Sequence, residues 1–296
     1  MLIRQNDKTG MLPMTQWEMP DDNFDLTRFK KFLVINSYRE TTIDTYEFRV
    51  AKYLKFAKTD KPSSEHAIKF IQTLVDKRLS HSTINNYSIA IMAYHRFAGD
   101  PYLKLPLLKV VNEIPSYFTE DEVNKIFSMI NNFKHYTMLK ILFYGCLRAS
   151  ELCDLDISDI NLSDLTLHIR DGKGGKPAKV MINDECGKLL DRYLAIRPTF
   201  FEDHRQPLFF TERGRRWNRH YLYQMFSIYK MKAGIKRKGG LHVFSRHTTA
   251  TLMTSKGLDI RIVKEILRHE DIRTTLRYSH VADTTKREKY NTYLQL

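Results

Sequence analysis

The sequence predicts a mainly α-helical protein with one small β-sheet, divided between two domains. Apolar residues recur at three- and four-residue spacing along most of the chain, which is the period of an amphipathic helix. Two short extended runs enclose a glycine-rich turn at 171–177, which indicates a β-hairpin. The length of 296 residues favours two domains, and a stretch with three prolines at 101–117 is typical of the linker between them.

The N-terminal part of the chain is predicted to form a four-helix bundle over residues 24–100. Residues 1–23 precede it without helical periodicity, and we interpret them as a flexible leader. The second helix is expected to begin at Thr41, because Thr41 and Asp44 have the spacing of a capping box. Gly99 is placed to end the fourth. Each expected helix has an apolar face, which contains Phe29, Val50, Ile71 and Ile91 in the first to the fourth helix, respectively.

The C-terminal part, residues 118–296, is expected to be α+β. Thr119 and Glu122 form a capping box at its start, so helices are predicted at 119–131 and 135–147. The extended runs at 165–170 and 179–182 are the strands of the expected hairpin. Helical periodicity then returns at 184–196, 217–233, 246–256, 260–268 and 272–280, and in a tail at 284–296.

The charge balance favours a polyanionic partner. The chain has 48 Lys and Arg against 34 Asp and Glu, a net charge of +14, and nucleic acid is the usual partner of such a protein. No apolar run approaches 18 residues, so no membrane-spanning protein and no membrane partner is expected. The three cysteines form no C-x-x-C pair. We therefore expect neither a disulfide framework nor a zinc site, and a reducing cytoplasmic setting fits.

The positive charge is concentrated at 212–240. This segment holds nine Lys and Arg against one acid, Glu212, with tyrosines and a tryptophan between them. Such an imbalance repels itself unless phosphates neutralise it, and aromatic rings beside cations are common in nucleic-acid sites. The alternative interpretation is a solvated basic helix and loop. Seven of the cations are the candidate DNA-binding residues: Arg213, Arg215, Arg216, Arg219, Lys236, Arg237 and Lys238.

The segment 241–281 carries the residues most suggestive of phosphate chemistry. Arg246, His269 and Tyr278 occur there in order among apolar helical positions. Arginine can hold two phosphate oxygens at once and stays charged, and histidine can donate or transfer a proton near neutral pH. Tyrosine can act as a covalent nucleophile, although its free pKa of about 10 means that it needs help from cations or a base.

In order and spacing these residues resemble the C-terminal signature of the tyrosine recombinases, the family of phage integrases and Xer-type resolvases. Arg246 precedes His269 by 23 residues, and Tyr278 follows His269 by 9, within the string TTLRYSHV. Upstream, YGCLRASEL is similar to the family's first arginine box and puts Arg148 in that role. DGKGGK resembles the loop with the catalytic lysine, which matches Lys173, and Lys176 is the rival position.

The resemblance covers about residues 24–296. The N-terminal bundle, with STINNY at 82–87, is similar to the family's core-binding, SAM-like domain. The resemblance implies that residues 118–296 form a catalytic α+β domain. The two domains would close around duplex DNA, joined by the linker at 101–117.

Two positions depart from the family pattern. The third box of the family is written H-x-x-R-H, but the residue three before Arg246 is Val243. Either Ser245 is a one-residue insertion and His242 reaches the site, or the histidine role is vacant. In addition, Arg268 stands where the family usually has glycine. It either adds a phosphate contact or faces solvent.

The resemblance also implies a mechanism. Arg148 and Arg246 would hold the scissile phosphate, Tyr278 would attack it to form a 3′-phosphotyrosine, and Lys173 would protonate the leaving 5′ oxygen. The remaining two catalytic residues are histidines: His269 would bond the phosphate, and His242 would assist proton transfer at the nucleophile. The family uses no metal, ATP or other cofactor.

Exchange between two duplexes implies a homo-tetramer on DNA, with the tail at 284–296 docking into a neighbouring subunit. The biological task would be dimer resolution or integration and excision. Two alternatives stay open: a type IB-like relaxing enzyme that acts on one duplex, and a non-catalytic DNA-binding regulator on a degenerate recombinase fold.

Three neighbours of the motif residues have subordinate interpretations. Glu151 lies one turn after Arg148 and can orient it by a salt bridge. His247 and His280 are interpreted as supporting or core histidines.

Overall fold

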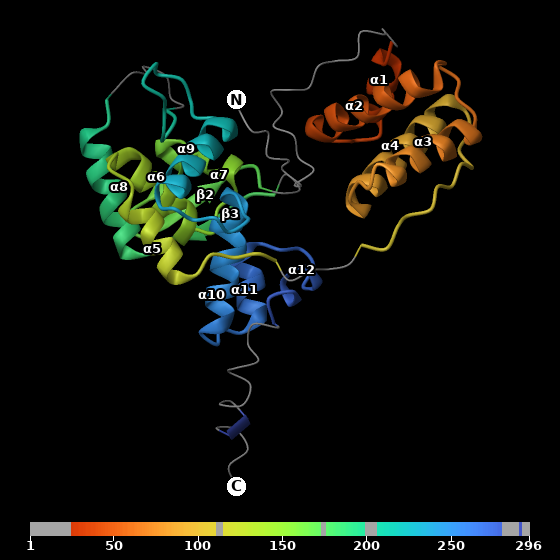
Figure 1. The fold of residues 1–296 in the computed structure, drawn as a ribbon. Helices are drawn as coiled ribbons and strands as arrows, with labels where there is room; N and C mark the ends of the chain where they lie inside the picture. The colour runs from red at the N-terminus through yellow and green to blue at the C-terminus, as the bar shows by residue number, and fades with distance from the viewer. Residues whose placement is uncertain (1–24, 111–114, 173–175, 199–205, 280–289, 292–296) are drawn as a thin grey trace, which may run out of the picture. The chain divides into compact units, whose positions relative to one another are not determined.

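The computed structural model describes residues 25–110, 115–172, 176–198, 206–279 and 290–291 (Figure 1). The chain divides into two compact units, Met1–Val111 and Asn112–Leu296, called here the N-terminal and C-terminal units. The predicted fold class is confirmed, because the chain is mostly helical with one three-stranded sheet. None of the described helices is long and apolar enough to cross a membrane. The leader at 1–23 lies outside the described residues.

The N-terminal unit is a bundle of four helices: α1 (Thr27–Ile35), α2 (Glu40–Ala57), α3 (Ser64–Asp76) and α4 (His81–Ala98). Aromatic rings fill its core, with Phe29 and Tyr94 packed edge to face at 5.3 Å. The capping box predicted at Thr41 and Asp44 is wrong. The N-cap of α2 is Arg39, because a tight turn with left-handed Ser37 (φ 59°) leads the chain into the helix before Thr41.

The segment after α4 packs against that helix. The Asn85 side chain donates to the Leu108 carbonyl and accepts from the Leu108 amide, both at 2.8 Å. The ring of His81 bonds the Lys109 carbonyl at 2.7 Å. Leu105 is buried in the bundle core. The first part of the proline-bearing stretch therefore belongs to the N-terminal unit.

The C-terminal unit opens as the sequence predicts. Thr119 Oγ1 accepts from the Glu122 amide, and the Glu122 carboxylate accepts from the Thr119 amide, which completes the predicted capping box. The helices that follow are α5 (Glu120–Ser128), α6 (Phe133–Tyr144), α8 (Asp184–Ile196) and α9 (Arg219–Lys232). Helix α6 contacts both α8 and the segment before α10, and it is buried along most of its length.

The hairpin is confirmed in its two strands, β2 (Thr166–Ile169) and β3 (Ala178–Met181), which pair antiparallel with Leu167 opposite Val180. A third strand, β1 (Ile160–Asn161), pairs with the other edge of β2. Neither β1 nor the short helix α7 (Ala149–Asp154) was predicted, because elements of two and six residues are too short to show a period.

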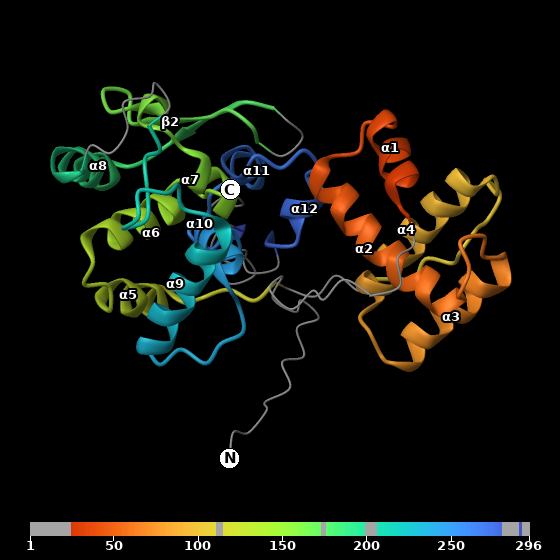
Figure 2. The same cartoon turned by 90° about the horizontal axis from the view of Figure 1, so that it is seen from above.

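The last elements lie side by side, as Figures 1 and 2 show: α10 (Thr249–Ser255), α11 (Ile260–Leu267) and α12 (Arg273–Leu276). A π-helical segment, η3 (Val243–Thr248), leads directly into α10. The predicted helix at 272–280 is shorter than expected, because only four residues are helical. Of the tail at 284–296, only Tyr290 and Asn291 lie within the described residues.

Two apolar clusters hold η3 and α10 in place. Phe244 packs in the main core, with its ring 4.9 Å from that of Phe226. Ala250 packs in a smaller cluster with Cys146, Leu267 and Tyr278. Because one continuous helical segment is anchored in both clusters, the residues between them have a fixed orientation.

Candidate active site

Arg148 is positioned by the turn between α6 and α7. Cys146 in this turn is left-handed (φ 46°), and Arg148 is the N-cap of α7. Glu151 accepts from the Arg148 amide at 2.8 Å with Oε2 and from Nη1 of its guanidinium at 2.6 Å with Oε1. The expected salt bridge is therefore present. Burial alone would raise the pKa of Glu151, but Arg268 and Arg148 together hold this pKa below its ordinary value.

Arg246 is almost completely buried, with 2% of its surface exposed. Nη1 donates to the Cys146 carbonyl at 2.8 Å, and Nη2 donates to the carbonyl of Leu267. Burial, and then the charges of Arg148 and Arg268, lower its pKa to about 10. Arg246 therefore stays charged at neutral pH and lies close to two further cations.

The segment with the unusual third-box spacing, η3, is π-helical. A π-helix pairs residue i with residue i+5 instead of i+4, so it can accommodate an inserted residue. Ser245 is buried and donates to the carbonyl of Leu147, in the turn before Arg148, at 3.0 Å. His242 stands at the N-terminal end of η3. Desolvation, and then the charges of Arg246 and Arg148, lower the pKa of His242 to about 4 although part of the residue is exposed.

Tyr278 lies at the end of a short chain of rings. Its hydroxyl is 2.6 Å from Nδ1 of His247, and the His247 ring packs edge to face against that of His242 at 5.0 Å. Burial raises the pKa of Tyr278, although Arg277 and Arg246 oppose this. Burial also lowers the pKa of His247 to about 4, with help from His242, Arg277 and Arg246.

The contact between His247 and Tyr278 is the main feature that motif reasoning missed. The available signal was weak: a histidine directly after the motif arginine, within a helix otherwise apolar or rich in threonine. Thirty-one residues separate the two partners, so only the tertiary structure reveals the contact.

His269 and Arg268 follow directly after α11. Nδ1 of His269 is 2.9 Å from the hydroxyl of Thr275, which is fully buried, so this bond fixes the ring orientation. Arg268 does not face solvent: its side chain is 16% exposed, and Nη2 lies 2.5 Å from Oε2 of Glu151. Glu151 therefore joins Arg268 to Arg148.

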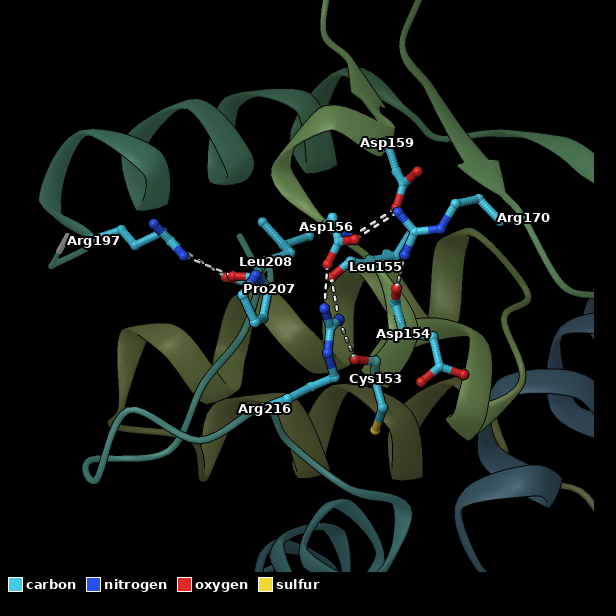
Figure 3. Close-up of polar contacts among 10 residues, drawn as sticks. All are labelled: Cys153, Asp154, Leu155, Asp156, Asp159, Arg170, Arg197, Pro207, Leu208 and Arg216. Carbon is cyan, nitrogen blue, oxygen red and sulfur yellow. Dashed lines mark hydrogen bonds and ion pairs between the residues drawn. The ribbon is translucent and has the colours of Figure 1, made fainter. Parts of the chain in front are cut away.

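Lys173 lies outside the described residues, as do its two neighbours up to residue 175. Arg170, which directly follows β2, is held by ion pairs (Figure 3). Arg170 Nη1 is 2.6 Å from Asp156 Oδ2 and 2.9 Å from Asp159 Oδ2. Its Nη2 donates to the Asp154 carbonyl at the end of α7. The end of β2 and the end of α7 are therefore fixed to each other.

The candidate DNA-binding cations do not form one uniform group. Arg216 pairs with the buried Asp156 and donates to the carbonyls of Cys153 and Leu155 (Figure 3). Arg237 is paired with Glu122 at 2.8 Å. The other five are exposed: Arg213, Arg215, Arg219, Lys236 and Lys238. Among the residues that the structure describes, no group of three His, Cys, Asp or Glu side chains is placed to bind a metal.

Comparison with known proteins gives matches over both units. Residues 116–285 match the model of the phage integrase family, and residues 26–100 match the N-terminal SAM-like domain of phage integrases. The tyrosine recombinase XerA of Pyrococcus horikoshii is 32% identical over 89% of this chain and 91% of its own length.

Solved structures give the same result for the fold. A crystal structure of XerA recombinase is 28% identical, with a TM-score of 0.54 over 92% of this chain and 98% of that one. A structure of XerH site-specific recombinase, described as bound to its palindromic difH substrate after cleavage, is 22% identical. Its TM-score is 0.66 over 86% of this chain and 80% of that one.

Proposed function

Since this chain belongs to the phage integrase family and is a tyrosine recombinase, we propose that it cuts and rejoins duplex DNA at a specific site through a 3′-phosphotyrosine at Tyr278. One observation carries the proposal. The Tyr278 hydroxyl contacts His247, whose lowered pKa keeps its ring neutral, and the buried Arg246 lies close enough to oppose the rise of the pKa of Tyr278. These are the two requirements of phosphoryl transfer to a tyrosine: a route for the phenolic proton and fixed positive charge.

Arg148 and Arg246 supply the fixed charge. Each would donate to non-bridging oxygens of the scissile phosphate, where negative charge grows in the transition state. Their positions are set before DNA binds, since Glu151 holds Arg148 and two backbone carbonyls hold Arg246. His269, oriented by Thr275, would add a hydrogen bond to the same phosphate.

Tyr278 would attack phosphorus as the bond to the 5′ oxygen breaks. Because burial raises the pKa of Tyr278, its proton must leave during the attack. His247 is the nearest acceptor, and His242 is next to it in the ring chain. Lys173 would give a proton to the leaving 5′ oxygen. The new phosphotyrosine bond keeps the energy of the broken one, so the reverse steps rejoin the strand without another energy source.

Duplex DNA is the proposed partner. The exposed cations between 213 and 238 would neutralise backbone phosphates, and the N-terminal bundle would contact the other side of the duplex. A homo-tetramer on DNA, assembled through the tail at 284–296, would exchange strands between two duplexes. Deleting 284–296 should abolish recombination but spare single-strand cleavage. Unchanged recombination would contradict the role of the tail.

The alternative of a non-catalytic regulator loses its main support. That alternative rested on a vacant histidine role at 243, whereas the π-helical η3 leaves His242 beside His247. The biological task, as dimer resolution or as integration and excision, depends on the DNA site.

The first test replaces Tyr278 with Phe. We expect the wild type to form a covalent adduct on a nicked suicide duplex, and Tyr278→Phe to form none while binding the same duplex. Tyr102→Phe is the matched control, because Tyr102 is an exposed tyrosine of the N-terminal unit. Adduct formation by Tyr278→Phe would overturn the assignment of the nucleophile.

A further inference from the structure

We propose that Arg268 is a third phosphate-binding arginine at the scissile phosphate, in addition to Arg148 and Arg246. The proposal rests on the proposed function, because it assumes that the phosphate binds at this arginine cluster. It is carried by the placement of the Arg268 side chain, by its hydrogen bonds and by the charge around it.

The backbone at Arg268 is one that favours glycine. Arg268 is the C-cap of α11 with φ 53° and ψ 48°, in the left-handed region that costs free energy for any residue with a Cβ atom. Lys58, the C-cap of α2, has a similar conformation (φ 56°), but it is exposed. Arg268 differs because this conformation brings its long side chain into the protein, beside Glu151.

The two terminal nitrogens of the Arg268 guanidinium differ in their hydrogen bonding. Nη2 donates to Oε2 of Glu151. Nη1 is buried and has no hydrogen-bond partner in the part of the chain that the structure describes. A buried, unpaired donor of a charged group is costly, so such groups are expected to meet an acceptor in the functional state.

Glu151 does not neutralise the cluster. Its two oxygens already accept from the Arg148 amide, the Arg148 guanidinium and Arg268. The cluster contains three guanidinium groups and this one carboxylate, an excess of two positive charges. Burial and then Arg148 act to lower the pKa of Arg268, whereas Glu151 raises it. A phosphodiester anion would relieve the repulsion and provide an acceptor for Nη1.

The competing explanation is that Arg268 only holds Glu151, and through it Arg148. A double-mutant cycle separates the two. Arg268→Gly suits the backbone and removes the guanidinium, and Glu151→Gln removes the shared carboxylate. We expect Arg268→Gly to slow adduct formation by about 100-fold, and to slow it in the Glu151→Gln background as well. No further loss in that background would overturn direct phosphate binding.

A second readout tests the charge itself. On a suicide duplex with a methylphosphonate at the scissile position, one non-bridging oxygen is replaced by a neutral methyl group. We expect the penalty of Arg268→Gly to shrink strongly on at least one of the two diastereomers. Equal penalties on the phosphodiester and on both methylphosphonates would overturn the proposal.

Lys58→Gly is the matched control for the effect on stability of placing glycine at an exposed left-handed C-cap. Thermal unfolding of each variant verifies that the fold is intact. The proposed function fails separately: wild-type protein would then form no adduct at all. If the wild type forms the adduct and Arg268→Gly forms it equally fast, only the role of Arg268 is wrong.

Discussion

At the scale of single residues, the site places a charged arginine and a neutral histidine in buried surroundings. Arg246 is buried, but each of its two terminal nitrogens donates to a backbone carbonyl, so the fixed charge does not depend on an acidic partner. His247, by contrast, is kept in its uncharged form. Burial and nearby cations keep its ring neutral at physiological pH, so the ring can accept a proton from Tyr278.

The neutral state of His247 predicts a pH dependence of stability. Its pKa of about 4 in the folded protein lies below the ordinary value of about 6.5. The unfolded chain therefore binds the proton more readily, and the stability provided by the neutral ring is lost as pH falls from about 6.5 towards 4. The loss from this ring is at most about 1.4 kcal/mol per pH unit.

Urea unfolding between pH 7 and pH 4.5 measures this dependence. His247→Gln should make the free energy of unfolding less dependent on pH. An unchanged slope in His247→Gln would show that this ring does not titrate as expected.

At the scale of elements, the spacing of motif residues predicts which helices carry the site but not how the helices adjust to it. The order of the site residues could be predicted from the sequence, because each lies in a string with several neighbours that match the family pattern: Arg148, Arg246, His269 and Tyr278. The π-helical turn could not be predicted, because a single inserted residue leaves no periodic signal. The sharing of Glu151 by two arginines depends on residues 117 positions apart, and no local pattern encodes it.

The π-helical segment predicts different roles for two adjacent residues. His242→Ala should slow adduct formation by about 100-fold, the usual effect of losing a proton-transfer group. Val243→Ala should leave the rate near that of the wild type, because the apolar Val243 side chain packs against the main core and cannot transfer a proton. A larger loss for Val243→Ala than for His242→Ala would place the π-helical turn in the wrong register.

At the scale of the whole molecule, the excess of positive charge separates into cations with different partners. Arg148, Arg246 and Arg268 are concentrated around one candidate phosphate position. Arg216 and Arg170 stabilise the fold through buried aspartates. Composition predicted the anionic partner from the total charge, but the total cannot reveal which arginines are occupied within the protein, because that depends on tertiary contacts.

This division predicts opposite effects for two nearby arginines. Arg213→Ala should reduce the salt dependence of DNA binding by about one phosphate contact and change the stability by less than about 0.5 kcal/mol. Arg216→Ala should instead lower the free energy of unfolding by about 3 kcal/mol, because it removes a partner of the buried Asp156.

Fluorescence anisotropy over a range of salt concentrations and urea unfolding measure the two quantities. The result that counts against this division is a stable Arg216→Ala variant with a reduced salt slope.

The bonds between Asn85 and Leu108 also determine where the N-terminal unit can be cut. A fragment that stops at Gly99 would lose Leu105 from the bundle core and would leave the Asn85 amide without its two backbone partners. A fragment that continues to residue 110 keeps all three. The smallest piece able to fold alone is therefore longer than its four helices, and limited proteolysis should leave a stable product that retains Leu108.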